Sequence, residues 1–541
     1  MTELLDVAGL QVAFGAADAS TTVVHDLSLG IGRGECVAIV GESGSGKSVT
    51  ARSLLGLAGR TATVNADRLR IAGQDRSIST EREWRRVRGR DVGLVLQDAL
   101  VSLDPLRPIG REIADTLRLH RRMTAAAATT HVHELLERVG MPDPARAARQ
   151  RAGELSGGLR QRALIASAIA LDPPLLIADE PTTALDVSIQ ARILALMTQL
   201  KRSGTGILLI SHDLAVVSAI ADRVIVLRNG RVVESGLTST VLTSPATDYT
   251  RELIAAVPSG RPRGVALLDP GTEAASRAAS VLSAPFPAEQ APVLRGTSLV
   301  KTYPSPAGRF RAVDDVSFEI RRGETLGLVG ESGSGKTTVA RLALALTAAD
   351  AGTVTLDGVN WLDAPERERR PLRRRIGAIY QDALSSFDPR FRVGRILEDA
   401  IGQAPPEHRE SVDQLLDSVG LPRDIAGSRP LHLSGGQRQR VAIARALAAA
   451  PEVLICDEPV SALDVTIQAQ VLDLLDGLQR ERGLGYLFIS HDLGVIRHMS
   501  DRIAVMQRGR IVESGPTASV LDDPQHPYTA QLVRDTPTLS V

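Results

Sequence analysis

The chain contains the same ordered set of short motifs twice. A glycine-rich segment ending in lysine, GESGSGKS, recurs as GESGSGKT, and four further motifs follow each copy in the same order. The repeated segments are 41–48 and 330–337, 97–105 and 381–389, 155–162 and 433–440, 177–192 and 455–470, and 210–214 and 489–493. Because such self-similarity decides the architecture of a chain, the 541 residues are expected to form two domains of one fold.

The segment between the two copies is interpreted as a linker. It contains six prolines and many alanines, and it lacks the sustained periodicity of a helix or a strand. We therefore expect a first domain at 1–257, a linker at 258–292 and a second domain at 293–541.

Short apolar runs predict an α/β fold in both halves. CVAIV and TLGLV directly precede the two lysine motifs, and a segment with a helical pattern follows each motif. Further runs, such as LLIAD and VLICD, have the length of buried strands. Runs of this kind are typical of parallel sheets that are covered by helices. Each half is therefore predicted to contain a mostly parallel sheet with helices.

The glycine-rich segments have the GxxxxGK[ST] pattern of a phosphate-binding loop. Glycines allow backbone N–H groups to turn toward phosphate oxygens, and the helix that follows points its positive end at them. Lys47 and Lys336 are expected to reach the β- and γ-phosphates, and Ser48 and Thr337 to bind Mg²⁺. A plain glycine turn is disfavoured, because the chain has four lysines beside 59 arginines and two of the four stand here.

Two carboxylates end a buried strand in each half. Asp179 and Glu180 close one apolar run, and Asp457 and Glu458 close its copy. The carboxyl ends of parallel strands meet at the sheet edge where the phosphate loop also lies. The aspartate is expected to hold Mg²⁺, and the glutamate to polarise an attacking water as general base.

Two further polar residues recur near these motifs. His212 and His491 follow later strands, 32 and 33 residues after the glutamates, which favours a γ-phosphate contact that orients the reacting water. A single histidine at such a place would more often be structural. Gln97 and Gln381 carry a side-chain oxygen suited to Mg²⁺ or to the water.

The LSGG motif precedes a long helical pattern in each half. Ser156 and Ser434 are predicted to be N-caps, and the glycines after them to expose backbone donors, which implies a second anion site. One nucleotide's phosphates occupy the lysine loop of each half, so these donors are available to the nucleotide of the other half. Two halves facing head to tail would hold two nucleotides between them.

As a set, the motifs resemble those of the ATP-binding cassette (ABC) family: Walker A, Q-loop, signature, Walker B, D-loop with Asp186 and Asp464, and H-loop. The resemblance implies two tandem P-loop NTPase domains, each with a helical signature subdomain, that bind ATP and Mg²⁺ and hydrolyse ATP. In the family the signature binds the ATP of the opposite half. One site would then combine Lys47, Gln97, Glu180 and His212 with Ser434, Gly435 and Gly436, and the other Lys336, Gln381, Glu458 and His491 with Ser156, Gly157 and Gly158.

The resemblance also assigns the remaining site residues. Phe14 and Tyr303 match the aromatic side chain that stacks on adenine, although an aromatic residue in a strand is otherwise ordinary core. The expected loop contacts to ATP are Gly41, Ser43, Gly44, Ser45, Gly46, Lys47, Ser48 and Val49, with Gly330, Ser332, Gly333, Ser334, Gly335, Lys336, Thr337 and Thr338. The expected Mg²⁺ ligands are Ser48, Gln97, Asp179, Thr337, Gln381 and Asp457, and the expected catalytic residues are Glu180, Glu458, His212 and His491.

Within the family, QDALVSLDP and QDALSSFDP are similar to the stretch after the Q-loop glutamine of dipeptide and oligopeptide importer ATPases. DYT at 248–250 and HPYT at 526–529 resemble the segment that closes those subunits. The chain thus looks like two such subunits fused, with Leu159 where the signature usually has glutamine. Those subunits often carry a cysteine cluster. Cys36 and Cys456 lie apart in apolar runs and are expected in the core, so no iron–sulfur cluster is expected.

The resulting hypothesis is the ATP-hydrolysing subunit of a bacterial peptide importer, peripheral on the cytoplasmic face of the cell membrane. Its expected partners are two integral-membrane permease subunits and a separate extracytoplasmic substrate-binding protein. The sequence contains no run of 18 consecutive apolar residues, which is the length needed to span a bilayer. Nucleic acid is not an expected partner, since 63 basic residues balance 63 acidic ones.

Two alternatives to this hypothesis agree less well with the sequence. A soluble tandem cassette acting on ribosomes or DNA usually has a long charged helical linker, zinc cysteines or coiled-coil insertions, which this sequence lacks. A sugar importer usually has an eroded second site, whereas both sites are intact here. The transported cargo stays open among dipeptides, longer peptides, nickel and haem-like compounds.

Overall fold

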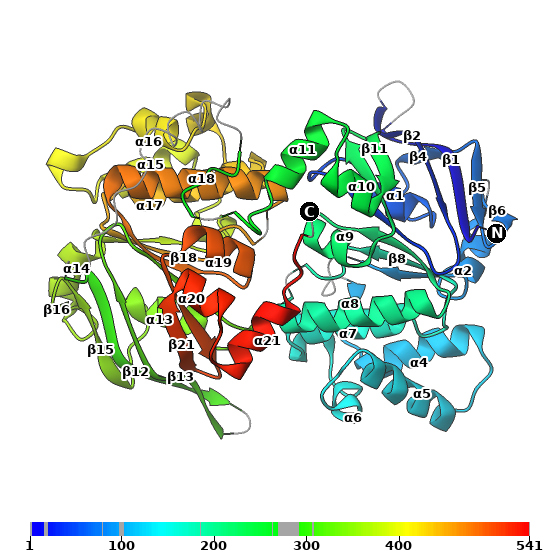
Figure 1. Cartoon of the computed structure of the whole chain (residues 1–541), viewed down its shortest axis with the longest axis horizontal. Coiled ribbons are helices and arrows are strands. Elements are labelled where there is room, and N and C mark those ends of the chain that lie inside the picture. Colours follow the sequence, from blue (N-terminus) through cyan, green and yellow to red (C-terminus); the bar gives the residue numbers. More distant parts are fainter. Residues whose placement is uncertain are drawn as a thin grey trace. The chain divides into compact units, whose positions relative to one another are not determined.

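The computed structural model describes residues 3–15, 20–77, 79–96, 102–183, 185–261, 263–268, 291–305, 308–461 and 463–539. By its contacts the chain divides into two compact units, residues 1–254 with 537–541, and residues 255–536. We call them the first and the second domain and describe each by itself (Figure 1).

The first domain is built on a six-stranded sheet with the order β11-β10-β3-β9-β8-β7. All neighbouring strands are parallel except β10 and β11. The strands are β3 (Cys36–Val40), β7 (Val92–Val95), β8 (Leu175–Asp179), β9 (Gly206–Ile210), β10 (Arg223–Arg228) and β11 (Arg231–Leu237). Every residue of β3, β8 and β9 is buried, which explains their apolar sequences.

The second domain repeats this sheet with the order β17-β18-β19-β14-β20-β21. Again only the last pair is antiparallel. The strands are β14 (Thr325–Val329), β17 (Ile376–Ile379), β18 (Val453–Asp457), β19 (Gly485–Ile489), β20 (Arg502–Gln507) and β21 (Arg510–Pro516). The prediction of a mostly parallel sheet in each half is confirmed, as is the burial of both cysteines.

A second, antiparallel sheet faces the first across a helix in each domain. In the first domain it contains β1 (Leu5–Phe14), β2 (Thr21–Ile31), β4 (Ala62–Asn65), β5 (Arg68–Ile71) and β6 (Gln74–Asp75). In the second it contains β12 (Leu294–Ser305), β13 (Gly308–Ile320), β15 (Ala351–Leu356) and β16 (Val359–Asn360). One apolar core joins both sheets of a domain and the helix after the lysine loop. These antiparallel sheets were not predicted from the sequence.

A helical subdomain, as the resemblance implied, adjoins the parallel sheet of each domain. In the first it contains α4 (Ile109–His120), α5 (Ala125–Arg138), α6 (Pro144–Ala147) and α7 (Gly157–Ala168), which contact one another (Figure 1). In the second it contains α15 (Val393–Ile401), α16 (Val412–Ser418) and α17 (Gly435–Leu447).

The other described helices lie outside the helical subdomains. They are α1 (Lys47–Ser53), α2 (Glu81–Val87), α8 (Val187–Arg202), α9 (Leu214–Ile220), α10 (Thr238–Thr243) and α11 (Asp248–Ala255), and α13 (Lys336–Ala343), α14 (Glu366–Arg373), α18 (Val465–Arg482), α19 (Leu493–Met499), α20 (Thr517–Asp522) and α21 (Pro527–Asp535). Five short 3₁₀ segments lie in the part of the chain that the structure describes: Ala152–Glu154, Leu384–Ser386, Pro406–His408, Arg423–Gly427 and Pro430–His432.

An aspartate and a cation hold the start of the strand that leads to each lysine loop. Asp222 accepts hydrogen bonds from the backbone N–H of Cys36 (2.8 Å) and from Nζ of Lys201 (2.9 Å). In the second domain, Asp501 accepts from the N–H of Thr325 (2.8 Å) and pairs with Arg263. Lys201 therefore does in the first domain what Arg263 does in the second.

Arg263 belongs to the described part of the expected linker, and that part is bound to the second domain. The backbone N–H groups of Leu267 and Leu268 donate to Asp473 at 3.0 and 3.2 Å, and the side chain of Leu267 is buried. Arg263 also donates to Gln479 at 2.7 Å. Residues 255–268 thus belong by contact to the domain that follows them.

Replacement of Lys201 or Arg263 by methionine leaves the aspartate carboxylate without its cation. Each change is expected to cost about 1–2 kcal/mol of the unfolding free energy of its own domain. The two tryptophans make this measurable: Trp84 lies in the core of the first domain and Trp361 in that of the second. Urea unfolding is followed by fluorescence with the other tryptophan replaced by phenylalanine.

The matched control is Arg395→Met, which removes an exposed ion pair with Asp399 in the second domain. It is expected to change the unfolding free energy by less than about 0.5 kcal/mol. A Lys201→Met variant that left the Trp84 transition unchanged would contradict the role of this contact.

Candidate nucleotide-binding sites

In each domain the glycine-rich loop is pressed against the end of a neighbouring strand. Gly41 has a φ of 149°, and a Cβ there would lie 2.1 Å from the carbonyl oxygen of Leu227 in β10. Gly330 has a φ of 155°, and its Cβ would lie 2.2 Å from the carbonyl oxygen of Met506 in β20. No side chain fits at either position, so the sheet itself requires the first glycine of the motif.

The loop lysine is buried in both domains. Nζ of Lys47 donates to the carbonyl oxygens of Gly41 (2.7 Å) and Glu42 (2.8 Å). Nζ of Lys336 donates to Gly330 (2.7 Å) and Glu331 (2.9 Å). Each ammonium is thus held inside the curve of its own loop, as a phosphate-binding lysine requires.

The other predicted loop residues lie in the same two loops and in the first turns of the helices that follow them. Ser43, Gly44, Ser332 and Gly333 are exposed at the tips of the loops, Gly46 and Gly335 precede α1 and α13 with φ values of 101° and 109°, and Val49 and Thr338 lie in the first turns of those helices. The hydroxyl oxygens of Ser45 and Ser334 are buried and lack a hydrogen-bond partner among the described residues. Buried hydroxyls without partners in a glycine loop fit a site that a ligand completes.

A hydroxyl and a carboxylate meet at each sheet edge. Oγ of Ser48 donates to Oδ1 of Asp179 at 2.9 Å, and Oγ1 of Thr337 donates to Oδ1 of Asp457 at 3.4 Å. Oδ2 of Asp179 is buried and has no partner among the described residues. Burial raises the pKa of both aspartates. A cation would relieve this cost, and these are the oxygen ligands that Mg²⁺ prefers, so the residues fit such an ion.

The glutamate and the histidine of each half are in contact. Nδ1 of His212 lies 3.2 Å from Oε1 of Glu180, and Nδ1 of His491 lies 3.3 Å from Oε2 of Glu458. Both glutamates have a left-handed backbone, with φ values of 50° and 51°. This conformation is uncommon for a residue other than glycine, and it occurs at the same place in both domains.

The pKa values of each pair are shifted in opposite directions. Burial raises the pKa of Glu180 and lowers that of His212, but the hydrogen bond and the attraction between them outweigh burial. The pKa of Glu180 therefore lies below its ordinary value and that of His212 above it. Glu458 and His491 have pKa values shifted in the same directions for the same reasons.

The structure places one of the two predicted glutamines at this pair. Nε2 of Gln381 donates to Oε2 of Glu458 at 3.1 Å. Gln97 lies outside the described residues. In the first domain Thr183 donates to Oε2 of Glu180 at 3.0 Å, a contact that the sequence analysis missed.

The signature serines are N-caps, as predicted, but they are held differently. Oγ of Ser434 accepts from the N–H of Gln437 (3.2 Å), and the Gln437 side chain accepts from the N–H of Ser434 (3.0 Å). Oγ of Ser156 accepts from the N–H of Leu159 (3.4 Å), and leucine cannot return a bond. Leu159 therefore leaves the first signature with half of this capping box.

The two glycines of each signature differ in their surroundings. A Cβ on Gly158 would lie 2.7 Å from Ile189 of α8, and one on Gly436 would lie 2.6 Å from Ile467 of α18. Gly157 is exposed, and nothing lies within 4 Å of its Cβ position. The second glycine thus lies against an isoleucine of the next helix, whereas the first glycine of the first signature is open to a ligand. Gly435 is likewise exposed.

The remaining predicted residues lie at the edges of the sites. Phe14 in β1 is half-buried and packs against the core, and Tyr303 in β12 is half-buried with Nζ of Lys301 5.7 Å above its ring. Oδ1 of Asp186 caps α8 and that of Asp464 caps α18, by accepting from backbone N–H groups at 2.9 and 3.1 Å.

The structure adds one tyrosine to each loop. The hydroxyl of Tyr249 in α11 accepts a hydrogen bond from the N–H of Glu42 at 3.3 Å, and that of Tyr528 in α21 accepts from the N–H of Glu331 at 3.0 Å. In the sequence, both segments are notable only for their resemblance to the closing segment of importer ATPases. Their recurrence after the last strand of each half was the signal that could have linked them to the loops.

A parallel sheet, a phosphate loop with a buried lysine and an acidic strand end define each domain as a P-loop nucleotide-binding domain. The family model described as "ABC transporter" matches residues 24–183 and 313–461. The chain therefore belongs to the ABC transporter family, and both domains are ATP-binding ABC ATPase domains. The model described as "Oligopeptide/dipeptide transporter, C-terminal region" matches residues 233–280 and 512–541.

Curated relatives resemble the chain over almost its whole length. It is 41% identical to the "Glutathione import ATP-binding protein GsiA" of Salmonella choleraesuis, over 99% of this chain and 90% of the relative. It is also 41% identical to the "Peptidoglycan transport ATP-binding protein YejF" of Agrobacterium fabrum, over 98% of this chain and 96% of the relative. A solved structure titled "RNase-L Inhibitor", 20% identical, matches with a TM-score of 0.63 over 98% of this chain and 95% of the other, which shows the fold alone.

The two histidine–glutamate pairs predict how the stability of the nucleotide-free chain depends on pH. Their histidines have raised pKa values, so this contribution is complete below about pH 6.5 and is lost as the pH rises through the folded-state value. The glutamates have lowered pKa values, so theirs is complete above about pH 4.3 and is lost only at more acidic pH. The urea midpoint is therefore expected to fall between about pH 6 and pH 9.

The variant His212→Gln with His491→Gln should reduce this fall, because glutamine does not titrate. His432→Gln, at an exposed histidine, is the matched control and should leave it unchanged. An equal fall in the double variant and the native chain would contradict the assignment of the charges.

Proposed function

We propose that the chain is the energy-coupling ATPase subunit of an importer for peptides or peptide-like compounds. The proposal depends on one observation. Both domains have an intact lysine loop, two carboxylates at a strand end and a histidine, and these residues make corresponding contacts in the two domains. The match to the C-terminal region of oligopeptide and dipeptide transporters supports the class of cargo. Relatives named for glutathione import and for peptidoglycan transport support it further, since both names denote peptide-containing compounds.

Within each set, different residues perform different parts of ATP hydrolysis. The loop N–H groups and the ammonium of Lys47 or Lys336 bind the phosphates, and Ser48 with Asp179, or Thr337 with Asp457, would hold Mg²⁺. Mg²⁺, when bound, neutralises charge on the phosphates. Glu180 and Glu458 accept a proton from the attacking water, and His212 and His491 contact the γ-phosphate and orient that water.

We also propose that each signature completes the site of the other domain. The open surroundings of Gly157, and the exposed N-capping serines beside it and its copy, support this arrangement. Phosphate oxygens are favoured at such a helix N-terminus because its N–H groups point outward and its dipole is positive.

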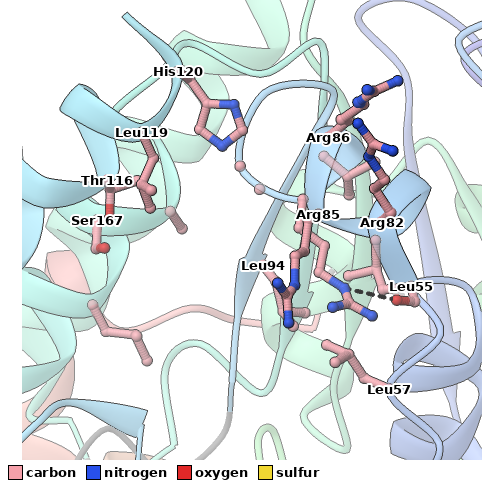
Figure 2. Close-up of a pocket in the computed structure, with 16 residues that line it drawn as sticks. Leu55, Leu57, Arg82, Arg85, Arg86, Leu94, Thr116, Leu119, His120 and Ser167 are labelled. Carbon is pink, nitrogen blue, oxygen red and sulfur yellow. Dashed lines mark hydrogen bonds between the residues drawn. The ribbon is translucent and has the colours of Figure 1, made fainter. Parts of the chain in front are cut away.

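A groove in the first domain supports docking to a membrane subunit. It has a volume of about 640 Å³ and lies among α2, β7, α4 and α7. Figure 2 shows Arg82, Arg85 and Arg86 on one side, and Thr116 and Leu119 on the other, with further leucines along the groove. Such a surface fits a short amphipathic helix that carries acidic residues. Gln97 lies two residues after the end of β7 in sequence, so docking here would be near the Q-loop.

The proposed partners are two membrane permease subunits and a separate substrate-binding protein, and the proposed place is the cytoplasmic face of the cell membrane. Among the described residues, no helix combines the length and the apolar composition that crossing a bilayer requires.

The combination of Glu180→Gln and Glu458→Gln removes both proposed general bases and keeps the size of the side chains. ATP hydrolysis by the purified chain is expected to fall by about 10²-fold or more, because the water loses its proton acceptor. Binding of ATP should persist, since the lysine loops are intact. Steady-state phosphate release and equilibrium binding of a fluorescent ATP analogue measure the two quantities.

Glu407→Gln with Glu410→Gln is the matched control, since both residues lie outside the sites. It should leave hydrolysis unchanged. Hydrolysis at the native rate in the variant of Glu180 and Glu458 would defeat the assignment of the bases.

Charge reversal of the groove, Arg82→Glu with Arg86→Glu, tests the docking surface. Recovery of integral-membrane subunits with the chain from solubilised bacterial membranes is expected to fall by about tenfold or more, because acidic groups of the partner would then be repelled. ATP binding by the isolated chain should not change. Arg146→Glu with Arg149→Glu, two exposed residues of the same domain, is the control with the same change in charge.

Recovery of ribosomes in place of membrane proteins with the native chain would contradict the importer assignment altogether. Undiminished recovery of membrane subunits with the groove variant would place docking elsewhere on the chain.

A further inference from the structure

Each C-terminal helix touches the phosphate loop of its own domain through one tyrosine. Tyr249 and Tyr528 are 4% and 6% exposed, and each hydroxyl accepts from the second backbone N–H of the loop, that of Glu42 or Glu331. The contact thus occurs independently in both domains. It joins the region matched as the transporter C-terminal region to the nucleotide site.

A glutamate fixes the start of these helices. Carboxylate oxygens of Glu234 in β11 accept from the N–H of Ala246 (2.7 Å) and of Thr247 (3.2 Å), just before α11. In the second domain, Glu513 in β21 accepts from the N–H of Gln525 (2.8 Å) and of His526 (3.0 Å), just before α21. These bonds lower the pKa of both glutamates against the effect of burial. The last strand therefore determines where the tyrosine lies.

The tyrosine and the loop lysine bind the same residue, the tyrosine at its N–H and the lysine at its carbonyl oxygen. In the first domain, Glu42 gives its N–H to Tyr249, and its carbonyl oxygen accepts from Nζ of Lys47 at 2.8 Å. Glu331 is held in the same way by Tyr528 and Lys336. The guanidinium of Arg228, 4.5 Å above the ring of Tyr249, further limits movement of that ring.

We propose that Tyr249 and Tyr528 are positioning residues of the two nucleotide sites. Each hydroxyl fixes the loop residue against which the lysine ammonium rests, and so sets the affinity of its own site for ATP. The C-terminal region then serves the nucleotide site as well as any role in transport. This inference rests on ATP binding by both domains and is independent of the cargo.

The variants Tyr249→Phe and Tyr528→Phe remove only the hydroxyl. A free loop N–H and a less restricted lysine should weaken ATP binding by about threefold to tenfold at the altered site, the range of a single hydrogen bond. The full chain is titrated with a fluorescent ATP analogue, and KM and kcat for ATP are measured. KM should rise in the double variant with kcat nearly unchanged, because the groups that carry out hydrolysis are untouched.

Tyr486→Phe is the matched control. Its hydroxyl donates to the carbonyl oxygen of Leu475 at 2.9 Å inside the second domain, so the variant loses a buried tyrosine bond that does not involve the loop. Its KM for ATP should equal that of the native chain even if its thermal midpoint falls. A rise in KM equal to that of Tyr528→Phe would overturn the proposal, because general loosening would then account for both.

Glu513→Gln provides a second route to the same contact. It weakens the hydrogen bonds that Glu513 accepts just before α21, so it should raise KM less than Tyr528→Phe does. The double variant should have nearly the same KM as Tyr528→Phe alone. Full additivity, or unchanged KM in both tyrosine variants, would reject the positioning role. Either result leaves the ATPase assignment intact, since that assignment depends on hydrolysis by the native chain and its loss in the variant of Glu180 and Glu458.

Discussion

The close approach of the glycine loop to the neighbouring strand end is the constraint on which each nucleotide site depends. A Cβ on Gly41 would lie only 2.1 Å from a backbone carbonyl of β10. This contact places the loop over the carboxyl edge of the parallel sheet. The lysine ammonium, the hydroxyl of Ser48 and the carboxylate of Asp179 gather there because β3 and β8 end at the same edge. The site is therefore a consequence of sheet order as much as of the motif.

The parts of the fold that the sequence predicted are those with a local signal. Uninterrupted apolar runs identified the parallel strands, and fixed spacing in both halves identified the loop, acidic and histidine residues. The antiparallel sheets carry no such signal. β1 and β12 are only partly buried, and repeated register shifts against β2 and β13 break the alternation that would reveal them.

Contacts between residues far apart in the sequence could not be predicted in the same way. Tyr249 reaches Glu42 across 207 positions, and Asp222 reaches Cys36 across 186. Neither pair has a spacing rule, because the connection depends on how β10 and β11 return to the loop. The role of Arg263 was hidden for another reason: its segment has the composition of a linker, yet an ion pair and backbone bonds attach it to the second domain.

The two domains are equivalent at the lysine loops and differ at the signatures. Ser434 is held by a complete capping box, whereas Ser156 has a single bond of 3.4 Å because Leu159 cannot return one. In the composite arrangement proposed above, the less constrained signature belongs to the site of Lys336, and the fully capped signature to the site of Lys47. Under that proposal, a difference in turnover between the two sites would result from how firmly each signature serine is held. Replacing Leu159 by glutamine would then remove the difference, whereas a change in the lysine loop of the second domain would not.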